Sequence, residues 1–205
     1  MLVRSSALFR ECLADLGAAH KITRALAHVF GPASERGVRG VEELQQQTIA
    51  LLSFKSQPRE VFDAQLAFNL LPRYGEEAPV ALEECELRLE RHLATLLAHS
   101  GHAPIPSLRL IQAPVFHGYS ISLWVEFESN PGITMIEQAL GGGDVDVRTG
   151  DTEPPDSVGM AGQNGIAVGG IAADRNHPRA AWLWIATDNL RLQAENAISV
   201  ARQLL

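Results

Sequence analysis

The segment SLRLIQAPVFHGYSISLWVEFE, residues 107–128, contains two strand-like runs joined by a turn. The second run, residues 119–128, alternates strictly, which is typical of a strand with one buried face; its apolar positions are Ile121, Leu123, Val125 and Phe127. The turn contains Pro114 and Gly118 and is followed at once by two hydroxyl side chains, Tyr119 and Ser120. The segment therefore predicts two neighbouring strands, and it raises the question of whether the turn between them has a chemical role.

The rest of the chain is helix-rich first and strand-rich later. Helical spacing of apolar residues predicts helices over 5–16, 40–52, 79–99, 133–140 and 188–205. Apolar or alternating runs predict further strands over 22–30, 145–148, 164–173 and 179–187. Residues 31–40 are expected to form a connector and residues 64–72 a short apolar element. This order favours an α+β fold, in which a sheet is covered by helices on one face.

Composition excludes several classes of partner. The 205 residues suit one large domain, and the net charge of −7 argues against a nucleic-acid or anionic-membrane surface. No run approaches the roughly 20 apolar residues that span a bilayer, and the start of the chain lacks the features of a signal peptide. Cys12 and Cys85 both fall in predicted helices, so a disulfide is not expected. These features predict a cytoplasmic protein.

Two glycine-rich stretches invite an anion-binding interpretation. GGGD, residues 141–144, follows a predicted helix, which favours a helix stop over a phosphate loop. GVRGVEEL, residues 37–44, precedes a helix and has Arg36 and Arg39 beside it, so an anion site is conceivable there.

The titratable side chains give weaker signals. The spacing of four histidines matches no common zinc pattern, so no metal is expected; they are His92, His99, His102 and His117. Cys85 lies between Glu84 and Glu86, whose charges would raise the pKa of a thiol, so it is a poor candidate nucleophile.

Five stretches, in order, resemble the carboxy-terminal half of the aspartate-β-semialdehyde dehydrogenase family. They are GPASERGVRGVEEL, LAFNLLP, LEECELRLE, APVFHGYS and WLWIATDNL. The resemblance implies a glyceraldehyde-3-phosphate-dehydrogenase-like domain with a mixed, largely antiparallel sheet. It assigns residues 1–205 to a dimerisation-type domain and implies that the NADP-binding Rossmann half is missing from this sequence. In the family, the helix corresponding to 188–205 returns to that half.

The family's reaction belongs to amino-acid biosynthesis and uses a Cys nucleophile, a His acid–base, an Arg on the substrate carboxylate, an orienting Gln and a phosphate-side Lys. On this sequence the Gln position falls on Gly31 and the Lys position on Glu86. The Arg position falls on Gln112 and the His position on Tyr119, while the acidic Glu83 is retained. The nucleophile position falls near residues 4–6, and Cys12 is the available thiol; the resemblance also assigns a cofactor contact to Asn196.

These departures favour a dimerisation domain that has lost the catalytic residues, similar to the Usg-type relatives. One alternative is a fragment of an active NADP-dependent dehydrogenase, and a second is a small-ligand or regulatory binding module. The expected partners are a second copy of the chain and a Rossmann domain, with no nucleic acid, membrane or cofactor for this chain itself. Trp124, Trp182 and Trp184 are each expected in the core, although one of them at a subunit interface would fit as well.

Overall fold

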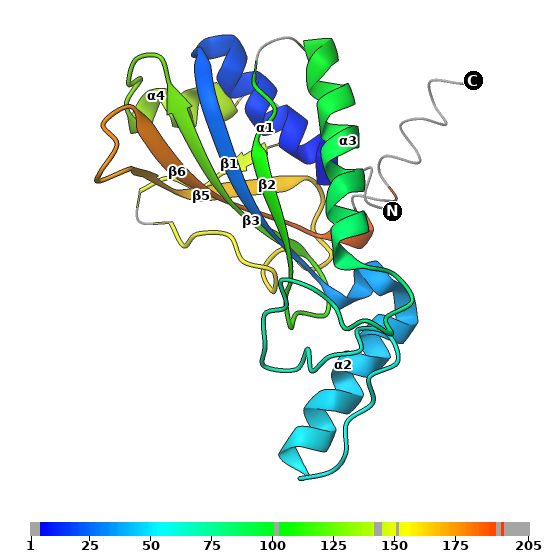
Figure 1. Ribbon diagram of the computed structural model, residues 1–205. Coiled ribbons are helices and arrows are strands. Elements are labelled where there is room, and N and C mark those ends of the chain that lie inside the picture. Colours follow the sequence, from blue (N-terminus) through cyan, green and yellow to red (C-terminus); the bar gives the residue numbers. More distant parts are fainter. Residues whose placement is uncertain (1–4, 101–102, 142–144, 151, 192–193, 195–205) are drawn as a thin grey trace, which may run out of the picture.

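A computed structural model describes residues 5–100, 103–141, 145–150, 152–191 and 194. The fold is built on one six-stranded sheet with strand order β2-β1-β3-β6-β5-β4 (Figure 1). The strands are β1 (Ile22–Gly31), β2 (Ser107–Gln112), β3 (Tyr119–Phe127), β4 (Val145–Val147), β5 (Ile166–Ala173) and β6 (Ala180–Thr187). β1–β2 and β4–β5 pair in parallel, whereas β1–β3, β3–β6 and β5–β6 are antiparallel. The mixed, largely antiparallel sheet of an α+β fold is confirmed.

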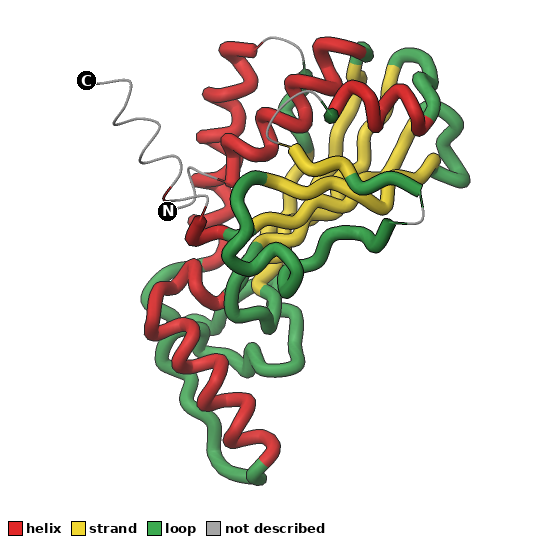
Figure 2. The backbone as a smooth tube through the Cα atoms, turned by 180° about the vertical axis from the view of Figure 1, so that it is seen from behind, coloured by secondary structure: helices red, strands yellow, loops and turns green. Residues whose placement is uncertain are grey.

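Three helices cover one face of this sheet: α1 (Ser5–Ala19), α3 (Leu82–Ser100) and α4 (Ile133–Leu140). Seen from behind in Figure 2, they lie over the strands. The alternating residues of β3 point into the core beneath them, and all are buried as predicted: Ile121, Leu123, Val125 and Phe127. In the described part of the chain, no helix is long and apolar enough to cross a membrane.

The opposite face of the sheet carries no described helix and is termed the open face. All three tryptophans lie on it and are half-buried, so the prediction that each belongs to the core is wrong. Their indole N–H groups are bonded within the chain: Trp124 and Trp182 both donate to Asp174 Oδ2, at 2.7 and 3.0 Å, and Trp184 donates to the Pro155 carbonyl at 2.9 Å. Alternation places the tryptophans on one face together, but it does not say which face the helices cover.

Below the sheet, α2 (Gly37–Leu52) and the segment 53–81 project as an arm (Figure 1). A 3₁₀ helix, η1 (Ala33–Arg36), leads into it, so the connector expected over 31–40 is largely helical. Two buried side chains of α2 hold the returning segment. Glu43 accepts the backbone N–H groups of Val61 and Phe62, at 2.6 and 3.1 Å.

Gln47 holds the same returning segment, and Glu43 and Gln47 are together termed the clamp. Its Oε1 accepts the N–H groups of Leu66 and Ala67, at 2.7 and 3.1 Å, and its Nε2 donates to the carbonyls of Pro58 and Ala64, both at 2.9 Å. The segment expected as an apolar element over 64–72 therefore has no helix or regular strand of its own. Side chains of α2 satisfy its backbone instead.

Several helix and strand boundaries differ from those predicted by the sequence. β2 ends at Gln112, since Pro114 has no N–H to continue the ladder. α3 begins at Leu82, so Pro79 lies before its first turn. Asp188 caps the following turn, because its Oδ1 accepts the N–H groups of Leu190 and Arg191 at 2.7 and 3.0 Å. Asn196 and most of the helix expected over 188–205 lie outside the described residues.

Candidate functional site

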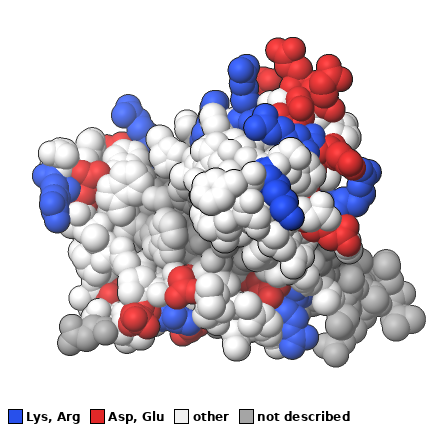
Figure 3. All heavy atoms as spheres, turned by 90° about the horizontal axis from the view of Figure 1, so that it is seen from below, with Lys and Arg blue, Asp and Glu red and all other residues white. Residues whose placement is uncertain are grey.

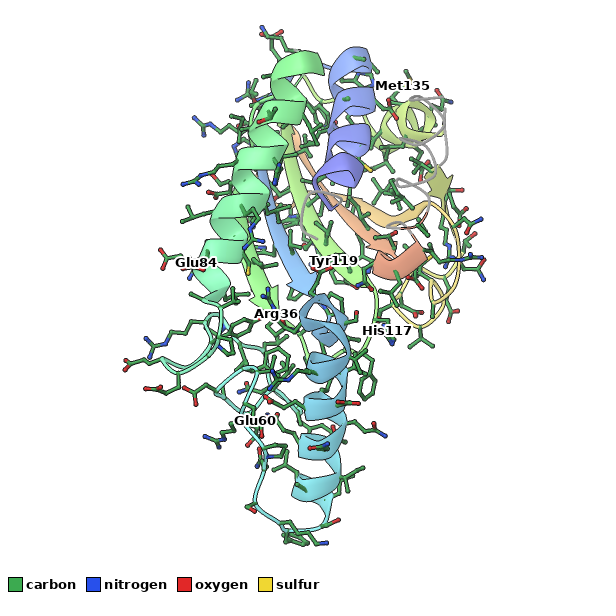
Figure 4. All side chains as sticks on the ribbon, turned by 90° about the vertical axis from the view of Figure 1, so that its right-hand side faces the viewer. Arg36, Glu60, Glu84, His117, Tyr119 and Met135 are labelled. Carbon is green, nitrogen blue, oxygen red and sulfur yellow. The ribbon has the colours of Figure 1, made fainter. Side chains whose placement is uncertain are left out.

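The ends of β1 and β2 and the start of β3 lie side by side where the arm begins. Gly31 is the register partner of Gln112, and Phe30 that of Ser120, the neighbour of Tyr119. Figure 4 shows Tyr119 at this end of the sheet, next to the start of the arm. The structure thus brings together three of the positions singled out from the sequence, and their side chains decide what this site can do.

Gln112 is 2 % exposed, and its amide is fully engaged. The Tyr74 hydroxyl donates to Gln112 Oε1 at 2.6 Å, and Gln112 Nε2 donates to the carbonyls of Gly31 and Ala113 at 2.8 and 3.2 Å. Its backbone exchanges two hydrogen bonds with Leu71, at 2.9 and 3.0 Å. The side chain is therefore a structural cross-link between β1, β2 and the arm.

Tyr74 joins this unit to a charged group. Burial raises its pKa to about 12, although the adjacent Arg36 opposes the rise. The Arg36 guanidinium lies 5.5 Å from the centre of the Tyr74 ring, and Arg36 Nη2 donates to Cys85 Sγ at 2.8 Å. At neutral pH the Tyr74 hydroxyl is consequently a hydrogen-bond donor rather than a proton shuttle.

The Tyr119 ring fills space beside Gly31. Tyr119 is 2 % exposed, and its Cε1 would lie 3.7 Å from a Cβ built on Gly31. The preceding Gly118 has φ +85°, and a Cβ there would lie 3.2 Å from the Thr187 carbonyl, so the turn requires glycine at this position. His117 is exposed on the outside of the same turn.

Asn189 fixes this turn against the start of the arm. Gly118 N donates to Asn189 Oδ1 at 2.9 Å, and Asn189 Nδ2 donates to Ser34 Oγ at 3.0 Å. Ser34 and Asn189 are both buried. The hydrogen bonds therefore connect η1, the turn before β3 and the residues after β6, three segments that are far apart in the sequence.

The sequence profile of the family described as "Semialdehyde dehydrogenase, dimerisation domain" matches residues 16–192. The chain belongs to this family. It is 28 % identical over 188 residues to an aspartate-semialdehyde dehydrogenase from Rickettsia bellii, covering 90 % of this chain and 55 % of that protein. It is 32 % identical over 174 residues to a USG-1 protein homolog from Pseudomonas aeruginosa, covering 84 % of this chain and 51 % of that protein.

Solved structures agree with this assignment. A probable aspartate-semialdehyde dehydrogenase from Pseudomonas aeruginosa superimposes with a TM-score of 0.87 at 29 % identity, covering 98 % of this chain and 60 % of that chain. The chain thus spans little more than half the length of the semialdehyde dehydrogenases that it resembles.

The other residues assigned from the semialdehyde dehydrogenase pattern lie apart from the strand ends or serve the fold. Glu86 Oε2 accepts the backbone N–H of Leu110 at 2.6 Å, which satisfies a donor of the edge strand β2. Glu83 is exposed on α3. Cys12 is fully buried in α1, and neither Cys12 nor Cys85 forms a disulfide. In the described parts of the chain, no group of three or more His, Cys, Asp or Glu residues is arranged to hold a metal ion.

A cleft of about 340 Å³ lies at the start of the arm, between η1, α2 and the segment before α3. Arg36 and Arg39, the two arginines of the conceivable anion site, both line this cleft. Both arginines already have partners within the chain, since Arg36 bonds Cys85 and Arg39 Nη2 lies 3.2 Å from Glu60 Oε2. Glu35 also lines the cleft and would repel an anion.

The sequence did not indicate that Tyr74 and Asn189 belong to this region, and it did not connect Arg36 with Tyr74. Tyr74 is 38 positions from Gln112, and no local pattern connects them. Asn189 lies in the stretch WLWIATDNL, which carried the semialdehyde dehydrogenase resemblance, so a signal for its importance was present. Its role is structural, however, and follows only from the tertiary contacts.

Proposed function

We propose that this chain is the dimerisation domain of an aspartate-semialdehyde-dehydrogenase-like protein that does not carry out the dehydrogenase reaction. The observation that supports the proposal most strongly is the state of Gln112, which occupies the position of the substrate-binding Arg in the family pattern. Its amide is buried and bonded to Tyr74, Gly31 and Ala113. A substrate carboxylate would find neither a guanidinium nor a free donor there.

The neighbouring positions point in the same direction. Tyr119 replaces the His acid–base, and a phenol lacks the titration near neutral pH that makes an imidazole an effective proton shuttle. Glu86 replaces the phosphate-side Lys, so its charge would repel phosphate, and it already accepts the Leu110 N–H. Cys12, the candidate thiol, is fully buried in a helix.

Self-association is the function that remains for such a domain, and the open face is the surface proposed for it. The face carries half-buried aromatic side chains along adjacent strands: Phe30, Trp124, Trp182 and Trp184. Aromatic residues are enriched in interface cores. Because all four lie on the uncovered side of the sheet, a second copy packed there would complete their burial.

The proposal is tested by two measurements on the complete gene product. An assay with aspartate semialdehyde, NADP and phosphate should show no turnover above the uncatalysed reaction, because the required side chains are absent. Turnover that is abolished by Cys12→Ser would overturn the non-catalytic reading and favour an active dehydrogenase. Light scattering at micromolar concentration should give the mass of a dimer, whereas a monomer would overturn the dimerisation function.

A further inference from the structure

The dipeptide Asn164–Gly165 lies in the loop that leads directly into β5. Asparagine is a labile residue in water, because the backbone nitrogen of the next residue can attack its side-chain amide. Glycine hinders this attack least, since it has no side chain, and Asn164 is the one asparagine of the chain that glycine follows. Gly165 has φ 72°, a backbone conformation that other residues rarely adopt. The two residues therefore combine a reactive amide with the least hindered neighbour.

The Asn164 side chain is also free to rotate. Asn164 is exposed, and its amide has no hydrogen-bond partner in the described part of the chain. By contrast, the side-chain amides of three other asparagines donate hydrogen bonds at distances of 3.2, 2.7 and 3.0 Å: Asn69, Asn130 and Asn189. The attack requires the side-chain carbonyl carbon to swing onto the next backbone nitrogen. A bonded amide resists this rotation, whereas that of Asn164 does not.

The residues that follow other asparagines offer a less available nitrogen. Asn130 is followed by Pro131, which has no N–H to lose. After Asn176, the N–H of His177 donates to Asp174 Oδ1 at 3.0 Å, and the attack would break this bond. Both arrangements oppose a reaction at the preceding amide.

We propose that Asn164–Gly165 is a site of spontaneous deamidation, with water as the co-reactant. The Gly165 nitrogen loses its proton and attacks Asn164 Cγ; the new N–Cγ bond forms, the Cγ–Nδ2 bond breaks, and the side-chain nitrogen leaves as ammonia with that proton. Water then opens the cyclic imide at one of its two carbonyl carbons. One opening gives aspartate, and the other gives isoaspartate, in which the main chain runs through the side-chain carboxyl carbon. The reaction is independent of the proposed function.

Isoaspartate would lengthen the backbone beside two anchored residues. Thr187 Oγ1 donates to the Gly165 carbonyl at 2.9 Å. Ile166 is 2 % exposed and is the register partner of Val145 on β4. An extra backbone carbon between Asn164 and Gly165 displaces these groups from their partners. The modification should therefore destabilise the start of β5.

The added charge should matter less than the altered backbone. Deamidation adds one negative charge to a chain whose net charge is −7. Figure 3, which looks up at the molecule from below, shows acidic and basic side chains lying close together on that surface. A single exposed charge contributes little to stability. Asn164→Asp carries the charge on an ordinary backbone, so this variant separates the two effects.

The first test follows the complete chain during incubation at neutral pH. After digestion at mildly acidic pH, which avoids further deamidation, mass spectrometry should show the peptide that contains Asn164 gaining one dalton and separating into two products. A methyltransferase specific for isoaspartate should label one of them. A synthetic peptide of residues 158–170 gives the rate without the fold, and the folded chain should react within about tenfold of that rate, because exposed loops open at little free-energy cost.

Asn164→Gln is the matched variant, because its longer side chain would have to close a larger ring, and it should yield neither product. The peptides that contain Asn130 and Asn176 are internal controls and should keep their masses. A folded chain that reacts more than about tenfold slower than the synthetic peptide would overturn the site. Equal conversion at Asn130 or Asn176 would overturn it as well.

The second test measures hydrogen–deuterium exchange at the start of β5, residues 166–168. Exchange there should be at least about tenfold faster in the isolated isoaspartate form than in Asn164→Asp, which should match the wild type. Equal exchange in the isoaspartate form and in Asn164→Asp would overturn the expected effect on β5.

Discussion

At the strand ends where the arm begins, single side chains decide the available chemistry. The Tyr74 hydroxyl needs an acceptor, and Gln112 Oε1 supplies it at 2.6 Å. A guanidinium at position 112 has no acceptor to offer, so the arginine of the family pattern is incompatible with the present position of Tyr74. Gln112 therefore serves as a structural cross-link at the position that the family resemblance assigns to arginine.

The alkaline stability of the protein should report on Tyr74. Because folding raises its pKa to about 12, the folded chain retains a proton that the unfolded chain loses above about pH 10. This contribution is fully present below pH 10 and is lost as the pH rises to 12; it amounts to about 2–3 kcal/mol. Absorbance titration at 295 nm, combined with urea unfolding, measures both effects.

Tyr74→Phe is the matching variant, since it removes the titrating group but keeps the ring. At pH 8 it should be less stable than the wild type by about 1–3 kcal/mol, because a buried amide oxygen of Gln112 loses its donor. Between pH 10 and 12 its stability should fall less steeply than that of the wild type. An equally steep decline in both proteins would contradict the assignment to Tyr74.

Asp174 makes the stability of the open face depend on pH in the acidic range. Backbone N–H of Asn176 and the indole of Trp124 are the largest favourable contributions that hold the pKa of Asp174 below its usual value. The stabilisation is thus present above the unfolded pKa of about 3.9 and is lost as the pH falls through the lower folded value. The chain contains three tryptophans, all on this face, so their fluorescence should change in that acidic range.

Asp174→Asn provides the control for this acid transition. The amide cannot ionise, so the variant should lack the fluorescence change that depends on Asp174. It should also be less stable at neutral pH, because an NH₂ group then faces one of the N–H donors that the carboxylate now accepts. A wild-type transition that persists unchanged in the variant would assign it to another carboxylate.

At the scale of elements, the arm depends on the two buried polar residues of α2. Gln47→Ala removes four hydrogen bonds to the returning segment, so backbone groups of residues 58–67 lose their partners. Hydrogen–deuterium exchange in that segment should rise at least about tenfold, while β3 and β6 stay protected. The exposed Gln45→Ala is the control and should change neither. Unchanged protection in Gln47→Ala would show that the clamp does not order the arm.

The elements differ in how far the sequence could predict them. β3 was predictable because one face is buried and its residues alternate, and the Asp188 cap was predictable because an Asp side chain reaches the first N–H groups of a helix. The arm was not, because the backbone of 58–67 bonds to the side chains of Glu43 and Gln47 rather than to a strand. Patterns within a segment cannot reveal partners contributed by another segment.

The candidate site shows the same limit. Its strand ends followed from the resemblance, which placed Gly31, Gln112 and Tyr119 in one site, and the structure does bring them together. The residues that fill the site could not be predicted from the resemblance, since Tyr74 is contributed by the arm and Asn189 by the segment after β6. The sequence predicts which side chains differ from the family pattern, whereas only the tertiary contacts show which side chains fill the space between the strand ends.

At the scale of the whole molecule, one face of the sheet is covered by helices and the other carries aromatic side chains without such a cover. A sheet stable in water normally buries its apolar face against another layer. On the open face, hydrogen bonds to Asp174 and Pro155 satisfy the indole N–H groups, but the tryptophan rings remain half-buried. A second copy of the sheet is the layer that would complete this architecture.

This architecture predicts that a charge introduced at the centre of the open face will separate the two copies. Ser122 is half-buried on β3, with Trp184 as its register partner on β6, so Ser122→Arg places a cation among aromatic side chains. In a two-fold dimer both copies would carry it, and the two like charges would be desolvated together. Light scattering should then give a monomer at micromolar concentration, with the circular dichroism spectrum of the wild type. Thr134→Arg on α4, exposed on the helical side, should remain dimeric, and a dimer that survives Ser122→Arg would place the interface elsewhere.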